Sequence, residues 1–420
     1  MELLRNGRPR VVITGLGAVT AHGPVKSLWE NLKNGKSGIR RLETIDIEHV
    51  PVKIGGEVRN FDPGEYIEHK EARRMGRASQ FAVVAAARAI EDAGITIGDI
   101  ENEGERVGVL LGTSLGSHEL AEQSEYRYKT SGFKKPNPLM LVNSLPNMPS
   151  HHVSKFLRAL GPLSTTSTAC AAGTQAPGDA SELIKLGRAD MVITGGVEAV
   201  LQDYAMAGFE AMDALSTGFN DNPEKACRPF DKNRNGFVYS EGGGVMVLES
   251  LAHAIKRGAR IYAEVLGYAT SSDAFHVAAL DPEAGGATRS MKWALADAHV
   301  GIDEIQYINA HGTSTQANDA METLAIKKVF GEHAYNIPIS SSKSMLGHAL
   351  GASGAIEIIA CVMSLVDQVI HPTINYETPD PECDLDYVPN VAREFKGLKR
   401  ILSNSFGLGG QNASIVLGKI

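Results

Sequence analysis

Three short segments of the sequence place a reactive side chain directly after a run of residues typical of a β-strand. The side chains are Cys170, His311 and His348. Open α/β sheets form their sites at the carboxyl ends of strands, so we expect the three groups to lie close together. A thiol can act as a nucleophile, and two imidazoles can stabilise the negative charge of an enolate.

Cys170 stands in the sequence Thr-Ala-Cys-Ala-Ala-Gly, where an expected strand passes abruptly into an expected helix of small residues, 171–186. At a helix N-terminus, unpaired backbone N–H groups and the positive end of the dipole favour thiolate over thiol. The position therefore predicts a lowered pKa and a nucleophilic sulfur. The alternative is a small buried cysteine at a tight packing point, a common role of this residue.

His311 and His348 lie in loops rich in Gly, Ser and Thr, where an imidazole has no apolar face to fill. Two neutral imidazoles can donate hydrogen bonds to one carbonyl oxygen as an enolate forms there. Lys343 lies five residues before His348 and could fix its geometry or its charge state. Glu357 and Glu322, each on a following helix, could support the histidines, or could be ordinary solvated carboxylates.

The elements that must position these groups are short β-rich runs alternating with alanine-rich helical stretches, which indicates an α/β protein. Eleven runs are expected to be strands: 10–15, 106–112, 162–168, 190–195, 244–249, 261–267, 305–309, 337–341, 369–374, 401–405 and 413–417. The clearest helices are 27–33, 78–93, 171–186, 287–298, 318–330 and 351–366.

A charged segment, 251–260, separates two stretches of similar pattern. Each stretch ends in a glycine-rich turn, which hints at an internal duplication. We therefore expect two halves: 1–258 carries Cys170, and 259–420 carries both histidines. Eleven strands are too many for one simple dinucleotide-binding sheet, and the Gly-Leu-Gly at 15–17 lacks the third glycine of that motif.

Composition excludes several classes of protein. The 420 residues suffice for two or three average domains, and 41 basic against 49 acidic residues give a net charge of −8, which argues against nucleic acid as a partner. Four cysteines without a C-x-x-C pair indicate a reducing compartment and no zinc site.

The sequence shows no signal for export or membrane insertion. The N-terminus lacks the apolar stretch of a signal peptide, and 352–366 is too short and too polar to span a bilayer. We therefore expect 352–366 to be a buried helix, and the protein to be cytoplasmic and to bind no membrane.

Four segments in order and spacing carry a family resemblance: Thr-Ala-Cys-Ala-Ala-Gly, Ala-His-Gly-Thr-Ser-Thr, Ser-Lys-Ser-Met-Leu-Gly-His and Asn-Ser-Phe-Gly-Leu-Gly-Gly-Gln-Asn. Together they resemble the β-ketoacyl-acyl carrier protein synthases, closest to type II, over nearly the whole chain. The resemblance implies a thiolase fold, in which two duplicated α/β halves form a five-layered α-β-α-β-α core, usually as a homodimer. It also implies no bound cofactor, because the phosphopantetheine arrives on acyl carrier protein.

By this resemblance Cys170 accepts an acyl chain, and His311 and His348 donate to the thioester carbonyl of a malonyl group as carbon dioxide leaves. The backbone N–H groups of Cys170 and Leu408 would form the oxyanion hole. Further roles follow from the same likeness. Lys343, Glu357 and Glu322 would support the histidines, and Phe406 and Leu408 would form the gate. The substrate would be contacted by Thr313 and Thr315 at the pantetheine arm, by Phe237 beside the malonyl carboxylate, and by Leu115 in the acyl pocket near the dimer interface. Plain core packing is an equal alternative for Phe237.

Carrier protein is acidic, so its docking face must be locally basic. Two clusters match docking regions of relatives: Lys70, Arg73, Arg74 and Arg77, and Arg127, Lys129, Lys134 and Lys135. The alternative for each cluster is an ordinary solvated surface.

Three positions depart from the family pattern. One of them, Gln316 in place of the usual proline after Thr315, should matter little. Leu408 stands where relatives usually carry a gating phenylalanine, which leaves the chain-length preference open. Pro177 lies inside the helix that follows Cys170, where a proline costs about 3 kcal/mol and bends the helix.

Three other functions compete with the synthase. The Gly-Thr-Ser-Leu-Gly at 112–116 matches the G-x-S-x-G of serine hydrolases, with Ser114 as nucleophile. A thiolase would use a second cysteine late in the chain, and Cys383 is the candidate. A chain-length partner subunit would have the fold without the nucleophile, which the presence of Cys170 argues against.

Overall fold

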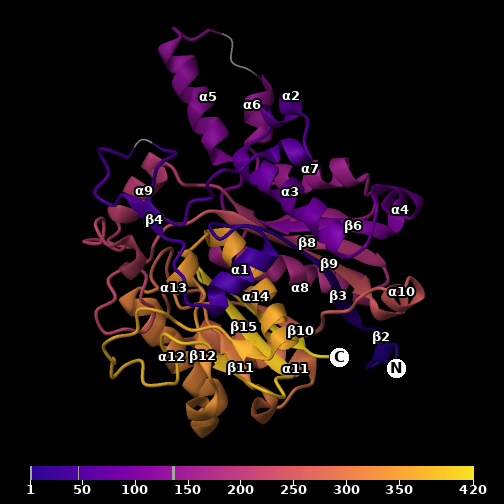
Figure 1. The fold of residues 1–420 in the computed structure, drawn as a ribbon, viewed down its shortest axis with the longest axis vertical. Helices are drawn as coiled ribbons and strands as arrows, with labels where there is room; N and C mark the ends of the chain where they lie inside the picture. The colour runs from indigo at the N-terminus through magenta and orange to yellow at the C-terminus, as the bar shows by residue number, and fades with distance from the viewer. Residues whose placement is uncertain (1, 46, 135–137) are drawn as a thin grey trace.

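Ten strands form one continuous sheet in the computed structural model, which describes residues 2–45, 47–134 and 138–420 (Figure 1). The spatial order is β12-β11-β15-β16-β10-β3-β9-β8-β6-β7. The strands are β3 (Val11–Val19), β6 (Val107–Gly112), β7 (Leu163–Thr166), β8 (Met191–Glu198), β9 (Gly242–Ser250), β10 (Ala263–Ser272), β11 (Tyr307–Asn309), β12 (Ile339–Ser340), β15 (Arg400–Gly407) and β16 (Gln411–Gly418). All ten correspond to strands expected from the sequence.

The expected strand 369–374 is the exception. Only Val369–Ile370 is extended there, as β13, and it pairs with β14 (Arg393–Glu394) in a separate two-stranded ladder. The remaining short strands are β1 (Leu4–Arg5), β2 (Arg8–Pro9), β4 (Arg40–Arg41) and β5 (Ile54–Gly55).

The sheet is an internal duplication. Numbered in chain order within each set, the first five strands and the last five both follow the spatial order 3-2-4-5-1. Strand directions also match, because two parallel pairs are followed by two antiparallel pairs in each set. The sets meet where β3 pairs antiparallel with β10. The duplicated architecture is thus confirmed, while the boundary at 258/259 stays a prediction.

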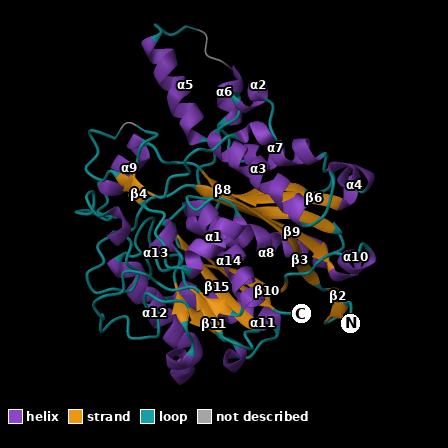
Figure 2. Cartoon of the chain, in the orientation of Figure 1, coloured by secondary structure: helices purple, strands orange, loops and turns teal. Residues whose placement is uncertain are grey.

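Helices cover the outer faces of the two halves of the sheet, and further helices lie between the halves (Figure 2). The long helices are α1 (Val25–Lys33), α3 (Arg77–Asp92), α5 (His118–Thr130), α7 (Met148–Leu157), α8 (Ala172–Lys185), α9 (Asp203–Glu210), α11 (Gly285–Ala298), α12 (Gln316–Phe330) and α14 (Ser353–Asp367). The short ones are α2 (His69–Ala72), α4 (Ile97–Asn102), α6 (Pro138–Asn143), α10 (Leu251–Lys256) and α13 (Lys343–Leu346).

The helices α8 and α14 contact each other and strands of both sets, whereas α3 packs on the first set and α11 on the second. The order of layers is therefore α-β-α-β-α, as expected. Strand β9 shows how the sequence produces it: Val245 and Val247 belong to the core beneath α3, and Met246 and Leu248 to the core around α14. Alternate side chains point to opposite faces of a strand, and a strand covered on both faces is apolar throughout.

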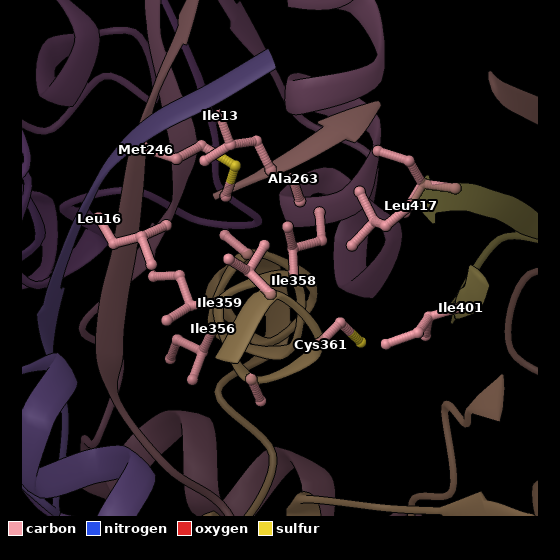
Figure 3. Close-up of a cluster of buried hydrophobic side chains, with 14 of the residues drawn as sticks. Ile13, Leu16, Met246, Ala263, Ile356, Ile358, Ile359, Cys361, Ile401 and Leu417 are labelled. Atoms are coloured by element: carbon pink, nitrogen blue, oxygen red, sulfur yellow. The ribbon is translucent and has the colours of Figure 1, made fainter. Parts of the chain in front are cut away.

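The helix α14 is the centre of the core, as Figure 3 shows for Ile356, Ile358, Ile359 and Cys361. The span Leu350–Asp367, with a mean hydropathy of 1.7, is long and apolar enough to cross a membrane, so the argument from its length was wrong. The expected buried helix is nevertheless confirmed, because 83% of this span is buried inside the protein.

Glycines bring α8 and α14 into direct backbone contact, and these two helices position the candidate site. A Cβ atom on Gly173 would lie 2.6 Å from the carbonyl oxygen of Gly351 and 2.8 Å from the backbone nitrogen of Ala355. Backbone atoms cannot move aside as a flexible side chain can, so Gly173→Ala is expected to lower the free energy of unfolding by about 1–3 kcal/mol.

Urea denaturation measures this change, and Gly208→Ala is the matched control. Gly208 lies within α9 with nothing within 4 Å of its added Cβ, so alanine should be neutral or stabilising by roughly 0.5–1 kcal/mol. Equal effects of the two substitutions would contradict the close packing of α8 on α14.

Candidate active site

Cys170 lies in a short 3-10 turn, Ala169–Ala171, between β7 and α8. The chain turns sharply there, and Ala169 adopts a left-handed conformation with a φ of 48°. The end of β15 packs on the same turn: a Cβ on Gly407 would lie 3.2 Å from the backbone nitrogen of Cys170. This approach directs the backbone N–H of Leu408 at the sulfur. Two backbone N–H groups, of Leu408 and of Cys170 itself, therefore stabilise negative charge at this point.

The thiol of Cys170 is not the low-pKa group that the sequence predicted. Burial raises its pKa to about 11, although the charge of Lys343 and the N–H groups of Leu408 and Cys170 lower it. The physical reason is that removal from water disfavours the thiolate more than the nearby positive charges favour it. The helix end is also displaced, because α8 begins at Ala172 rather than directly at the cysteine.

Alkylation of Cys170 should therefore show no plateau near neutral pH. The thiolate is the reactive form, so the rate with iodoacetamide is expected to rise about tenfold per pH unit from pH 7 to pH 10. Mass spectrometry of the peptide that contains Cys170 measures the rate, with a free cysteine peptide as control. A plateau below pH 8 would instead show an activated thiolate in the resting protein.

The rings of His311 and His348 lie 5.3 Å apart, centroid to centroid, at an angle of 84°. Burial lowers the pKa of both imidazoles well below the usual value, and the charge of Lys343 lowers it further. Both are therefore neutral at pH 7, as the sequence analysis required of two hydrogen-bond donors.

Hydrogen bonds around His348 select its tautomer. Its Nδ1 lies 2.9 Å from the hydroxyl oxygen of Ser353, and the same oxygen accepts the backbone N–H of Ala349 at 2.9 Å. The hydroxyl of Ser353 can donate to Nδ1, and in that arrangement the proton of His348 is on Nε2. The backbone N–H of His348 donates to the carbonyl oxygen of Val238 at 2.7 Å, so the backbone and the ring are each held by one hydrogen bond.

Lys343 and Glu357 form a fully buried ion pair behind the site. Burial raises the pKa of Glu357, and the charge of Lys343 opposes that rise. The ammonium group of Lys343 acts electrostatically on Cys170, His311 and His348 together. Lys343 thus lowers the pKa of all three groups, while burial is the larger cause of the shift at each of them.

Glu322 holds the loop that carries His311. Its carboxylate accepts the backbone N–H of His311 at 2.9 Å and of Gly312 at 2.8 Å. Burial raises its pKa to about 7, and the two N–H groups oppose that rise. In the same loop the hydroxyls of Thr313 and Thr315 lie 3.0 Å apart. The predicted supporting glutamates are thus both buried and bonded, and the solvated alternative is wrong.

Two aromatic rings border the histidine pair. Phe237 makes an edge contact with His348 at 5.5 Å, and Phe406 makes one with His311 at 5.7 Å. Phe237 belongs to the same buried cluster as Cys170 and Leu350, so it packs and borders the site at once. The structure therefore brings both predicted rings to the histidines.

The two predicted aliphatic pocket residues are less enclosed. Leu408 is 37% exposed and Leu115 is 38% exposed. Glu198 fixes Leu115, because its carboxylate accepts the backbone N–H groups of Ser114, Leu115 and Gly116 in that loop and of Gly351 close after His348.

Sequence reasoning missed Glu198 and Ser353. Glu198 ends β8 two residues after Gly195 and Gly196, a position that could have drawn attention to it. Ser353 carried no comparable signal.

The competing nucleophiles have other surroundings. In the part of the chain that the structure describes, no hydrogen bond joins the hydroxyl of Ser114 to a histidine, as a serine hydrolase requires. Cys383 lies in the core beneath α11 and α12, in a different cluster from Cys170. Cys383 is therefore in a different cluster from Cys170, and among the described residues Ser114 lacks the histidine that would activate it.

Only part of the first basic cluster is exposed to solvent. Lys70, Arg73 and Arg74 are exposed on α2 and the turn after it. Arg77 is different, because it pairs with Glu241 and stacks over the ring of Phe81.

The second basic cluster lies at the end of α5 and in the loop after it. Lys129 pairs with Glu125 on the same helix, and Lys134 is exposed in the loop that follows. Lys135 lies outside the described residues.

Known proteins share both the sequence and the fold. Two family models match the chain: "Beta-ketoacyl synthase, N-terminal domain" over residues 8–254 and "Beta-ketoacyl synthase, C-terminal domain" over residues 262–377. Two curated proteins named 3-oxoacyl-[acyl-carrier-protein] synthase 2 are similar to it along their length. The one from Synechocystis is 45% identical over 413 residues, and the one from Staphylococcus aureus strain N315 is 46% identical over 411 residues, with 98% of each chain covered in both cases.

Solved structures agree with this assignment. The ishigamide ketosynthase/chain length factor matches with a TM-score of 0.91 at 38% identity, over 98% of this chain and 100% of that one. A type II polyketide ketosynthase in complex with its acyl carrier protein matches with a TM-score of 0.89 at 38% identity and the same coverage. The match of both models across the two sets of strands shows that this chain belongs to the β-ketoacyl synthase family.

Proposed function

We propose that this protein is a 3-oxoacyl-acyl carrier protein synthase, which extends an acyl chain held on Cys170 by two carbons taken from malonyl-acyl carrier protein. The observation that carries the proposal is the pair of neutral, buried imidazoles bordered by Phe237, which belongs to the same buried cluster as Cys170, whose sulfur faces two backbone N–H groups. The curated relatives at 45–46% identity bear the name of this activity.

In the first half-reaction the sulfur of Cys170 attacks the thioester of an acyl carrier protein. One carbon–sulfur bond forms and one breaks, and the proton of the thiol passes to the departing pantetheine sulfur. The N–H groups of Cys170 and Leu408 stabilise the oxyanion of the tetrahedral intermediate. The burial that raises the thiol pKa causes no penalty in the product, because a thioester carries no charge.

In the second half-reaction His311 and His348 donate N–H bonds to the thioester carbonyl of a malonyl group. The carbon–carbon bond to the carboxylate breaks and carbon dioxide leaves. The electron pair of the broken bond stays on the thioester and forms the enolate that these donors stabilise. Phe237 faces His348 and offers no hydrogen bond to a carboxylate, so it favours loss of that charge.

The enolate carbon then attacks the acyl carbonyl on Cys170. A carbon–carbon bond forms, the carbon–sulfur bond breaks, and the released thiolate takes up one proton. The N–H groups of Cys170 and Leu408 stabilise this second oxyanion as they did the first.

The proposal includes no bound cofactor or metal. The phosphopantetheine arm enters with the carrier protein, and the adjacent hydroxyls of Thr313 and Thr315 are suited to bond its amide groups. No group of three or more metal-ligating side chains lies among the described residues, and the chemistry above has no step that needs one.

We also propose a cytoplasmic homodimer. Strand β7 is one edge of the sheet, and Leu160 and Leu163 beside it are 73% and 51% exposed. An unpaired edge strand is a template for pairing with another chain, and a second copy offers the same edge. The two exposed leucines would be buried in such a dimer.

The exposed cations Lys70, Arg73 and Arg74 are proposed to dock the carrier protein. Replacing all three by glutamate is expected to raise KM for acyl carrier protein about tenfold or more, because like charges repel across the interface. The kcat with a small pantetheine thioester should not change. Steady-state kinetics with both substrates measure the difference, with Lys396→Glu and Lys399→Glu on the C-terminal half as the control. Equal KM values for the two variants would exclude this docking face.

Mass spectrometry of the intact protein tests the proposed function. After incubation with acyl carrier protein the protein should gain one acyl mass at Cys170. Addition of malonyl-acyl carrier protein should then release that mass with one equivalent of carbon dioxide. Acylation of Ser114, or release without carbon dioxide, would contradict the proposal.

A further inference from the structure

Tyr239 places a phenol on the same face of the chain as Phe237, in the buried cluster that also contains Cys170. The segment 237–240 is extended, and Tyr239 forms a parallel bridge with His348. In extended backbone, residues two apart point to the same side, so Tyr239 and Phe237 share a face. Ser240 takes the opposite face, where its hydroxyl donates to the carbonyl of Gly56.

The ring of Tyr239 is enclosed by the walls of the site. It contacts Phe209 at 5.4 Å and Phe237 at 6.1 Å, and it belongs to the same buried cluster as Cys170 and Leu350. The ring is 1% exposed, so the ordinary reading would be an aromatic core residue. Phenylalanine would serve that role equally well.

The hydroxyl group is what packing does not explain. It is buried and has no hydrogen-bond partner among the residues that the structure describes. Glu198 lies near it, yet the carboxylate of Glu198 already accepts four backbone N–H groups. A buried hydroxyl without a partner is costly and is rare in native proteins, so its presence in a site points to a ligand.

The environment of the hydroxyl defines which ligand atom it can meet. Burial raises the pKa of Tyr239 well above its usual value, and the nearby acidic groups of Glu198, Cys170 and Glu122 raise it further. The phenol therefore keeps its proton at any pH the enzyme meets. A buried O–H group needs an acceptor for its hydrogen bond. Saturated hydrocarbon offers none, whereas a carbonyl or hydroxyl oxygen does.

We propose that the hydroxyl of Tyr239 donates a hydrogen bond to an oxygen atom on the acyl chain held by Cys170, so that the enzyme prefers oxygenated chains, oxo- or hydroxyacyl, over saturated chains of equal length. The inference rests on the proposed function, since it concerns the chain that Cys170 accepts. It assigns Tyr239 as a specificity-determining residue. A site built to bond an oxygen discriminates against the analogue that lacks it, because the protein group is then left unpaired.

Paired carrier proteins test this preference. One member carries a saturated acyl chain, and the others carry chains of the same length with a carbonyl or hydroxyl at successive carbons. The rate of acylation of Cys170 is measured by mass spectrometry for the protein and for Tyr239→Phe, which keeps the ring and removes only the hydroxyl. The ratio of the best oxygenated chain to the saturated chain is expected to fall about tenfold or more in Tyr239→Phe.

Tyr262→Phe is the matched control, because that phenol bonds Asp92 away from the site. An equal ratio in the protein and in Tyr239→Phe overturns the inference, and so does an equal fall in Tyr262→Phe. Failure of every chain to acylate Cys170 would instead remove the proposed function and the inference with it.

Thermal unfolding gives a second readout that does not depend on activity. Removal of an unpartnered hydroxyl should leave the Tm of Tyr239→Phe equal to or above that of the protein. A lower Tm would show that the hydroxyl is bonded within the protein, and would overturn the inference even if activity changed.

Discussion

Replacement of Cys170 by serine should abolish acyl loading, with a loss of at least about 10³-fold in the rate of acylation. A serine hydroxyl is a far weaker nucleophile than a thiol and has no base to activate it, since both imidazoles face the malonyl carbonyl in the proposed mechanism. The transfer would also convert a thioester into an ester rather than exchange one thioester for another. Intact-protein mass spectrometry after incubation with acyl carrier protein measures the loss.

Cys383→Ser is the matched control for this experiment, because Cys383 is buried in another part of the core and belongs to no site described above. It should load acyl chains normally and complete condensation. Loss of activity in Cys383→Ser at an unchanged Tm would favour a thiolase mechanism with two cysteines. The decarboxylation of malonyl-acyl carrier protein should survive in Cys170→Ser, since the histidines that stabilise the enolate remain in place.

The sequence predicted the sheet well because its strands are buried on both faces. Strand β3 is buried at all nine positions, and such continuous apolar runs are easily recognised. The run 369–374 was misleading because four of its six residues are β-branched, but His371 and Pro372 interrupt it, and only Val369 and Ile370 pair in a ladder. An apolar or β-branched segment thus indicates burial, but it does not show that the segment pairs as a strand.

The helices α5, α7 and α9 were not predicted. Helix α5 is mostly polar and buries only Leu120, so it has no apolar stripe that could reveal it. The charged segment 251–260 was read as a seam, and its first part is the helix α10. Pro177 lies inside α8, which continues through it from Ala172 to Lys185, and nothing in the structure explains the proline.

The site was predictable in its members but not in its electrostatics. The motifs identified Cys170, His311, His348 and Lys343, because reactive residues in small-residue loops stand out from a core. The pKa of Cys170 could not be obtained in the same way, since it depends on how much solvent the Phe237 and Leu350 cluster removes. Tyr239 gave no signal either, because only the packed structure shows that its hydroxyl lacks a partner.

Alanine at His311 or at His348 should separate the two half-reactions. Acylation of Cys170 does not use the imidazoles, so loading should stay within a few fold of normal. Condensation should fall about 10²–10³-fold in each variant, which is the typical effect of the removal of one donor to a developing oxyanion. Acyl loading is measured by mass spectrometry, and condensation by release of carbon dioxide from malonyl-acyl carrier protein.

Asparagine variants at the same positions distinguish a hydrogen-bond donor from a base. The amide of asparagine keeps a neutral N–H group, so His311→Asn and His348→Asn should retain more condensation activity than the alanine variants, whereas a base would be lost equally in both.

The pH profile of the condensation step gives an independent check. Both imidazoles have pKa values well below 6.5, so they stay neutral as pH falls from 7.5 to 6.5, and the condensation step should not slow in that window through imidazole protonation. Loss of condensation at an apparent pKa near 6.5 that disappears in either alanine variant would mean that a histidine titrates in solvent, and the buried donor pair would then be the wrong description of this site.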